Sequence, residues 1–327
     1  LDDLKLRFSY GTAGNNNIPS GQLNQEYEAK ATTWINGYPS YWAPSKTMSN
    51  PDLTWETTIT RNLGLDYTLL GGKLSGTLEA YWNTTKDLLI LFPTSGTGYD
   101  NQYRNMGETE NKGIDLTINS TNITNKNFTW NTSITLSHNK NSVKKLTGED
   151  VQLWEANFGY SQNTHIIGVN QPLGQMYGYV TDGLYQVSDF DYDAATKTYT
   201  LKDGVPYAGE KGNVKPGMWK FKNIDGSKDN KITEADKTVI GNAYPKIYGG
   251  INNTFTYKDF DLSIFLTYSI GNDVFNATKL TNTKTALQNK NVLAVADSKH
   301  RWVLVNKAGD LITDPQEMAD INKGKTV

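Results

Sequence analysis

The sequence contains no cysteine in its 327 residues. This absence excludes disulfide bonds, thiolate metal sites and cysteine-based catalysis, and it is common in envelope proteins that cross an oxidising compartment unfolded. Hydrophobic residues are scarce too, at 37%, against about 45–50% in an average soluble domain. Aromatic residues are nevertheless plentiful, with 19 Tyr and 8 Trp. Polarity therefore comes mainly from Asn, Thr, Ser and Gly, and less from charge.

A strong charge of one sign and long apolar runs are also missing. The formal net charge of −2 excludes the basic footprint of a dedicated nucleic-acid binder, so no nucleic-acid partner is expected. No segment approaches 18 consecutive apolar residues, which argues against a transmembrane helix, and the first residues, LDDLKLRFSY, show no signal peptide. A soluble β-protein and a β-barrel membrane protein both remain compatible with these absences.

Alternation of apolar and polar residues with a period of two dominates the sequence. In residues 59–69, Leu and Tyr share one face and Thr and Asn the other, and Arg61 is the single charge on the apolar side. Such alternation predicts β-strands. Strands are expected near residues 4–12, 56–69, 73–90, 108–121, 127–140, 247–257 and 260–272, with additional short strands within 160–190.

The connections between these strands alternate between short and long. Tight turns are expected at residues 69–73, 122–127 and 257–260, and long connections at 11–55, 93–107 and 142–245. Long strands with short turns at one end and long loops at the other are typical of an outer-membrane barrel. The apolar faces also end in aromatic residues, as at membrane interfaces: Tyr10, Tyr67, Trp82, Trp130, Tyr257 and Tyr268. The alternative is a soluble β-sandwich, whose strands are usually about five or six residues long, and the pattern favours the barrel.

Four ordered motifs carry a family resemblance: KLRFSYGTAGN (5–15), NPDLTWETT (50–58), NMGETENKGIDLTI (105–118) and PGMWKFKNIDGSKDNKITEADKTVIGNAYPK (216–246). The sequence resembles the C-terminal barrel half of SusC/RagA-type TonB-dependent transporters. The resemblance implies an all-β fold, an antiparallel up-and-down meander within a 22-stranded transmembrane β-barrel, in the outer membrane of a Gram-negative bacterium. It also implies nutrient import of an oligosaccharide or peptide. The implied partners are a SusD-like surface lipoprotein, the TonB complex and outer-membrane lipid.

Residues 1–327 are accordingly expected to form a partial barrel domain, an incomplete open curved sheet with long extracellular loops. Nothing in the sequence resembles a plug or a TonB box, so TonB would act through a region outside this chain. The last residues, NKGKTV, lack the amphipathic strand that closes such barrels. We therefore expect this chain to be a fragment of the barrel that cannot close the sheet by itself. The alternative function is that of a secreted or surface carbohydrate-binding β-protein without a transport role.

One chemically specific motif lies in the third long connection, at residues 225–236. Read as a twelve-residue calcium loop, it offers side-chain oxygens at positions one, three, five and twelve and a backbone carbonyl at position seven. The expected ligands of one structural Ca²⁺ are Asp225, Ser227, Asp229, Asp236 and, through its carbonyl, Lys231. Asn230 replaces the usual Gly at position six, and Asn tolerates the left-handed region. The alternative is a solvated turn that holds no ion.

A second candidate is an aromatic cluster in the first long connection, formed by Trp34, Tyr38, Tyr41 and Trp42. Flat aromatic faces among Asn and Ser suit sugar stacking or peptide contact. The alternative, which we favour, is a small core that folds the loop itself.

Catalytic motifs are missing from the sequence. The three histidines, His138, His165 and His300, are scattered, and no G-x-S-x-G, H-E-x-x-H or phosphate-loop motif is present. The sequence therefore predicts that the protein is not an enzyme.

Overall fold

The computed structural model describes residues 1–35, 38–94, 96–146, 151–155, 163–283, 291–297 and 299–326; the side chains of residues 30–35, 38–41, 151–155 and 163 lie outside that description. The chain divides into two compact units. Unit 1 comprises Leu1–Gln152, Ile167–Gly174 and Tyr244–Asp273, and unit 2 comprises Leu153–Ile166, Gln175–Ala243 and Val274–Val327. Among the described helices, none is long and apolar enough to cross a membrane.

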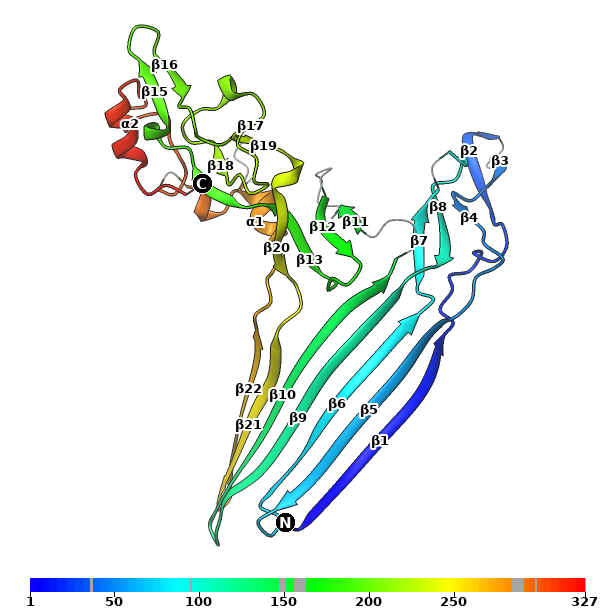
Figure 1. The fold of residues 1–327 in the computed structure, drawn as a ribbon. Coiled ribbons are helices and arrows are strands. Elements are labelled where there is room, and N and C mark those ends of the chain that lie inside the picture. The colour runs from blue at the N-terminus through cyan, green and yellow to red at the C-terminus, as the bar shows by residue number, and fades with distance from the viewer. Residues whose placement is uncertain are drawn as a thin grey trace. The chain divides into compact units, whose positions relative to one another are not determined.

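Unit 1 is built on a seven-stranded sheet in the order β1-β5-β6-β9-β10-β21-β22 (Figure 1). Its strands are β1 (Asp3–Asn15), β5 (Glu56–Leu69), β6 (Leu74–Lys86), β9 (Glu108–Thr124), β10 (Phe128–Lys145), β21 (Ile247–Tyr257) and β22 (Phe260–Ile270). All neighbours pair antiparallel, and the sheet order follows the chain order. The predicted up-and-down meander is therefore confirmed. β1 and β10 each extend beyond the alternating segments that predicted them.

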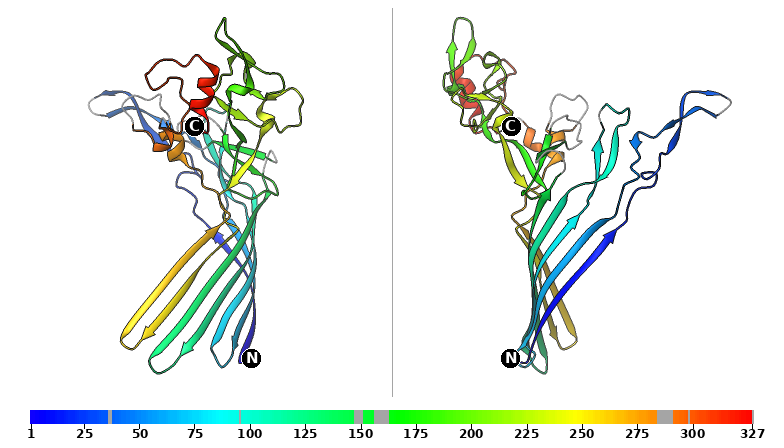
Figure 2. Two further views of the ribbon diagram at one scale, coloured as in Figure 1. Left: turned by 90° about the vertical axis from the view of Figure 1, so that its left-hand side faces the viewer. Right: turned by 45° about the vertical axis from the view of Figure 1, so that its right-hand side comes forward.

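Short turns gather at one end of this sheet, where they join β5 to β6, β9 to β10 and β21 to β22 (Figure 2). In the first of them, Leu70, Gly71 and Gly72 have φ angles of 60°, 64° and 81°. Glycine adopts such angles without strain, which is why two glycines close the turn. The long connections leave from the opposite end of the sheet.

The two faces of the sheet differ in polarity, as the period-two alternation predicts. On the face that we call the apolar face, Leu65, Leu78 and Leu116 lie in register on three neighbouring strands. Leu78 is 41% exposed and Ile264 on β22 is 44% exposed, so no second layer of the described residues covers this face. The sheet is thus a single open layer and not half of a sandwich. Such a large uncovered apolar surface is characteristic of contact with lipid.

On the apolar face, two strand glycines each lie beneath a tyrosine of the neighbouring strand. A Cβ atom added to Gly76 on β6 would lie 2.5 Å from the Tyr67 hydroxyl, and one on Gly249 of β21 would lie 2.7 Å from that of Tyr268. The Tyr268 hydroxyl also donates a hydrogen bond of 2.8 Å to the Thr135 carbonyl. These two tyrosines therefore each cover a glycine, and their place among the interface aromatics stays a prediction.

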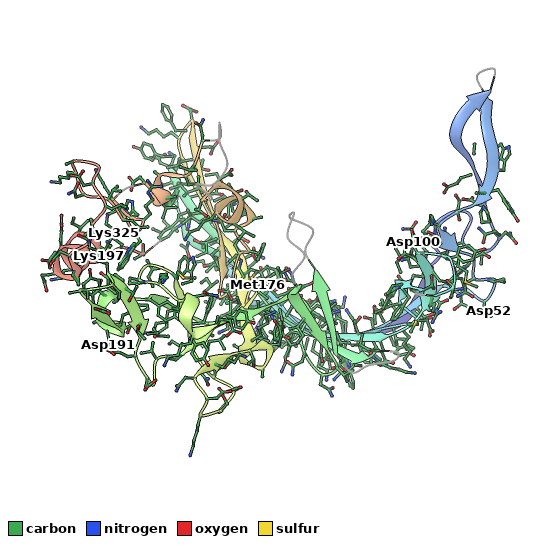
Figure 3. All side chains as sticks on the ribbon, turned by 90° about the horizontal axis from the view of Figure 1, so that it is seen from above. Asp52, Asp100, Met176, Asp191, Lys197 and Lys325 are labelled. Carbon is green, nitrogen blue, oxygen red and sulfur yellow. The ribbon has the colours of Figure 1, made fainter. Side chains whose placement is uncertain are left out.

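The first two long connections of unit 1 contain five short strands: β2 (Tyr27–Ile35), β3 (Tyr38–Pro44), β4 (Thr47–Met48), β7 (Leu89–Pro93) and β8 (Asn101–Asn105). β2 and β3 form a hairpin, while β4, β8 and β7 form a second small sheet. The two connections contact each other, because Asn50 donates a side-chain hydrogen bond of 2.9 Å to the Tyr103 carbonyl. Figure 3 labels Asp52 and Asp100 in these two connections.

The remaining strands are short: β11 (Val151–Glu155), β12 (Asn163–Gly168), β13 (Gln175–Tyr179), β14 (Thr181–Leu184), β15 (Phe190–Asp193), β16 (Thr198–Leu201), β17 (Tyr207–Ala208), β18 (Trp219–Phe221), β19 (Lys231–Ile232) and β20 (Lys237–Asn242). β12, β13 and β14 fulfil the expectation of short strands within 160–190. The α-helices are α1 (Ala277–Asn282) and α2 (Pro315–Asn322), and the 3₁₀ turns are η1 (Val187–Asp189), η2 (Lys211–Asn213), η3 (Glu234–Asp236) and η4 (Ala294–Ala296).

Unit 2 has a small apolar core of the kind found in soluble domains. Tyr185, Phe190, Leu201 and Val214 pack together and are each at most 5% exposed. The Tyr185 hydroxyl donates a hydrogen bond of 2.6 Å to the Pro206 carbonyl. Burial raises the pKa of Tyr185 to about 12. This segment, which lacks sustained alternation, is therefore held together by aromatic packing instead of a long hydrogen-bonded ladder.

Candidate functional site

The polar face of the seven-stranded sheet carries a charge network that spans three strands. The guanidinium of Arg7 on β1 donates to both carboxylate oxygens of Asp66 on β5, at 2.7 and 2.8 Å, and to Glu79 on β6 at 2.7 Å. Gly64 makes this crossing possible, since a Cβ there would lie 2.9 Å from the Arg7 Cζ. The network fixes the orientation of three charged side chains on a surface that is otherwise mainly uncharged.

Nearer the short turns, the polar face is lined by hydroxyl and amide groups. A pocket of about 210 Å³ lies there, and its walls include Ser75, Asn119, Asn131, Ser133 and Asn252. The Ser133 hydroxyl donates a hydrogen bond of 2.8 Å to the Asn119 side chain. Groups that both donate and accept hydrogen bonds suit neutral polar ligands.

Three of the expected calcium ligands lie together on the turn of the 225–236 loop. The Asp225 carboxylate accepts a hydrogen bond of 2.7 Å from the Ser227 amide, and the Asp229 carboxylate accepts one of 2.8 Å from the Ser227 hydroxyl. Asp229 also accepts a bond of 3.0 Å from the amide of Lys231, whose carbonyl is the expected backbone ligand. Asn230 has a φ of 56°, so it adopts the left-handed conformation that position six requires.

Asp236, the expected ligand at position twelve, is fully buried. Its carboxylate accepts backbone hydrogen bonds of 2.8 Å from Thr233, 2.7 Å from Ile224 and 3.2 Å from Asp225. These bonds, with that from Thr233 contributing most, hold the pKa of Asp236 below its ordinary value. Across the described residues, no group of three or more His, Asp or Glu side chains is placed to hold a metal ion. Calcium binding stays a prediction.

The aromatic cluster belongs to the β2–β3 hairpin. The side chains of Trp34, Tyr38 and Tyr41 lie outside the described residues. Trp42 pairs with Ala29 in the hairpin, and its side chain is 69% exposed. An indole so exposed is available to a ligand and is not part of a small core, so a role in ligand contact stays a prediction that now concerns Trp42 first.

Sequence reasoning missed a second charged cluster, which lies on the apolar face near the long connections. Arg61 on β5 lies 5.1 Å from the ring centroid of Trp82 on β6, and the Trp82 indole donates a hydrogen bond of 2.6 Å to Glu110 on β9. One signal in the sequence is that Arg61 occurs where the alternation calls for an apolar residue. Finding its partners requires the strand register, which local alternation does not reveal.

Comparisons with known proteins agree with one another. The family model described as "TonB dependent receptor-like, beta-barrel" matches residues 1–253. TonB-dependent receptor P3 of Formosa agariphila is 34% identical over 283 residues, which cover 84% of this chain and 26% of that protein. TonB-dependent receptor SusC of Bacteroides thetaiotaomicron is 30% identical over 291 residues, again covering 84% of this chain and 26% of that protein.

Solved structures show the same fold. The RagAB peptide importer in its closed-closed state matches with a TM-score of 0.65 at 24% sequence identity, covering 86% of this chain and 28% of that chain. The RagAB peptide transporter matches with a TM-score of 0.61, also at 24% identity, covering 82% of this chain and 27% of that chain. The chain thus spans about a quarter of the length of the relatives and structures that it matches.

Proposed function

We propose a function from one premise: the chain belongs to the family of TonB-dependent receptor-like β-barrels, whose model matches residues 1–253. Members of this family are not enzymes, in agreement with the sequence, and the chain is located in the outer membrane of a Gram-negative bacterium. We propose that it supplies part of the barrel wall and extracellular region of a TonB-dependent nutrient importer. The carbohydrate-binding β-protein without a transport role has no specific observation in its favour.

One observation carries this proposal beyond the family match. The seven-stranded sheet is a single layer whose apolar face is uncovered and whose opposite face is polar. In a transmembrane barrel, the apolar face contacts lipid and the polar face lines the lumen. The network of Arg7, Asp66 and Glu79 would then be part of the lumen wall.

The proposed cargo is an oligosaccharide or a peptide, delivered by a SusD-like surface lipoprotein and imported with energy from the TonB complex. The hydroxyl and amide lining around Ser133 and Asn252 suits either cargo, because sugars and peptide groups both donate and accept hydrogen bonds. The low charge of this lining favours a neutral oligosaccharide. The matched RagAB structures are those of a peptide transporter, which keeps a peptide as the second candidate.

Growth and uptake experiments test this proposal. A strain lacking the full-length gene should lose growth on one class of oligosaccharide or peptide, and loss of TonB or of a neighbouring SusD-like lipoprotein should have the same effect. Uptake of the labelled cargo should return with the full-length gene. Unchanged uptake of every cargo in the deletion strain would refute the importer.

A matched pair of variants tests which face lines the lumen. Ser133→Trp adds bulk to the polar face, whereas Ile134→Trp adds it to the apolar face of the same strand. We expect slower uptake with Ser133→Trp and normal uptake with Ile134→Trp, at equal amounts of protein in the outer membrane. Normal uptake with Ser133→Trp and slower uptake with Ile134→Trp would mean that the apolar face lines the lumen.

A calcium ion in the 225–236 loop is a separate proposal. It is supported by the proximity of Asp225, Ser227 and Asp229 and by the left-handed Asn230. Asp236 already accepts two backbone hydrogen bonds at one oxygen and one at the other, so coordination by both oxygens would require it to release some of them. The ion would fasten the loop and would take no part in transport chemistry.

A further inference from the structure

A row of cationic and aromatic residues crosses the apolar face near the long connections. Its members are Tyr10 on β1, Arg61 on β5, Trp82 on β6, Lys112 on β9 and Lys140 on β10. The next row toward the short turns contains Phe8, Leu63, Ala80 and Ile114, and it ends in His138 on β10. The charged row therefore borders the apolar surface directly.

The members of this row are held against one another. The Arg61 guanidinium lies 5.1 Å from the Trp82 ring centroid and 6.0 Å from that of Tyr10. The Lys112 ammonium lies 4.6 Å from the Trp82 ring centroid. The indole of Trp82 thus contacts two cations, one from each neighbouring strand, at the edge of the apolar surface.

The carboxylate of Glu110 lies behind the row. It does not neutralise the positive charge of the row. Glu110 is 8% exposed, and it binds the Trp82 indole at 2.6 Å, Lys112 at 3.0 Å and Lys144 at 3.2 Å. Lys112 and Lys144 contact this carboxylate, and with Arg61 and Lys140 the cluster contains four cations, so its formal excess is three positive charges. Glu110 therefore positions the lysines and leaves most of their charge uncompensated.

The level of the row in the membrane follows from the strand geometry. Lys140 is ten residues after Trp130, which stacks on Phe255 at 5.6 Å near the short turns. With about 3.3 Å per residue and a strand tilt of about 40°, ten residues span roughly 25 Å, the height of the apolar band in an outer-membrane barrel. Long loops are extracellular in such barrels. The row therefore lies at the headgroup level of the outer leaflet.

We propose that this row, with Lys144, is a binding site for the phosphate of an outer-leaflet lipid headgroup. A guanidinium and lysine ammonium groups are the donors that bind phosphate, and the fork of Arg61 can donate two parallel hydrogen bonds. The acyl chains of the same lipid would contact Phe8, Leu63 and Ile114 immediately below. This pairing of phosphate and acyl chain favours a lipid over a free anion.

Lipid titration of the full-length receptor, followed by native mass spectrometry in detergent, tests the site. The probes are bisphosphorylated lipid A, the same lipid A without phosphates, and glucosamine 1-phosphate as a phosphate without acyl chains. The test variant combines Arg61→Gln, Lys112→Gln and Lys144→Gln. The control combines Lys73→Gln, Lys126→Gln and Lys258→Gln, which removes the same charge at the short turns.

We expect the test variant to bind phosphorylated lipid A roughly tenfold or more weakly than the native receptor, and the control to bind within about twofold of it. Lipid A without phosphates should bind the native receptor about as weakly as phosphorylated lipid A binds the test variant. Equal losses in both variants, or equal binding of the two lipids, would overturn the proposal. Equally tight binding of glucosamine 1-phosphate would replace it with a free-anion site.

A single substitution keeps the test decisive if the triple variant does not fold. Lys140→Gln leaves the contacts of Glu110 intact, and its side chain is exposed. It should weaken binding of phosphorylated lipid A by about fivefold, and unchanged binding would contradict the site. Because lipid binding is measured without transport, failure of the importer proposal leaves this result unaffected.

Discussion

The seven-stranded sheet and unit 2 are stabilised in opposite ways. The sheet exposes its large apolar residues, including Leu78, and is held by long ladders of backbone hydrogen bonds. Unit 2 has short strands and buries Phe190 and Leu201 in a core. The same chain therefore contains one region that relies on lipid to cover its apolar surface and another that covers its own. Substitutions of one type should have different effects in the two regions.

The largest difference is expected from truncating leucine. Leu201→Ala removes a side chain that is 3% exposed from the core of unit 2 and should cost about 2–5 kcal/mol of local stability. Leu266→Ala, on the apolar face, leaves no cavity because lipid or detergent can fill the space, so its cost should be smaller. Hydrogen exchange of the full-length receptor would measure both effects. Equal loss of protection in the two variants would contradict the comparison.

Insertion of a charge should destabilise the seven-stranded sheet more than unit 2, which is the reverse of the order expected for leucine truncation. Ile264→Arg places a cation on the apolar face and should cost about 2–4 kcal/mol if that face meets the middle of a bilayer. Val239→Arg, at a residue of unit 2 that is also partly exposed, should change stability by no more than about 0.5 kcal/mol. Urea titration of the receptor folded into lipid vesicles would test this. A tolerated Ile264→Arg would argue that lipid does not cover the sheet.

Substitutions in the 225–236 loop separate a structural carboxylate from a calcium ligand. Asp236→Ala removes the acceptor of three backbone hydrogen bonds and should make residues 216–245 several-fold more sensitive to protease, without unfolding the long strands. If calcium binds with a Kd on the order of 10⁻⁴ to 10⁻³ M, chelator should increase cleavage of the native protein, and Asp225→Ala should act like chelator. Identical digestion with and without chelator would mean that the loop is a solvated turn that holds no ion.

The smallest expected effect is a pH dependence confined to the same loop. The folded-state pKa of Asp236 lies below its ordinary value of 3.8 because backbone amides donate to the carboxylate. Its contribution is therefore fully present above about pH 4 and is lost as pH falls through the lowered folded-state value. Pepsin digestion between pH 5 and about pH 2 should reveal cleavage at the acid end. Asp236→Asn should abolish this dependence, and a persisting pH dependence would assign it to another group.

Sequence reasoning located the long strands because their signal is local. The alternation in 247–257 and the turn after it define β21 and the start of β22, and both agree with the structure. The charge networks could not be found in that way. Arg7 and Asp66 are 59 positions apart, and only the register between β1 and β5 brings them together.

The 225–236 loop shows a second kind of feature that the sequence alone does not predict. The spacing of Asp225, Asp229 and Asp236 fits a calcium loop, but an aspartate at the last position can also accept backbone hydrogen bonds. The pattern does not distinguish these roles because both require a carboxylate at one place. The core of unit 2 was missed for a related reason: contacts such as that of Tyr185 with Phe190 follow no period in the sequence.

The tyrosines that cover glycines have a consequence for how the strands find their partners during membrane insertion. A slip of one residue between β21 and β22 would turn every lipid-facing side chain toward the lumen, so polarity alone penalises it. A slip of two residues keeps each side chain on its own face, so polarity does not penalise it. It would, however, move the ring of Tyr268 from Gly249 onto Ile247 or Ile251, where a branched side chain occupies the space. The glycine and tyrosine pairs thus disfavour strand pairings that are shifted by two residues, which the polarity of the two faces does not disfavour.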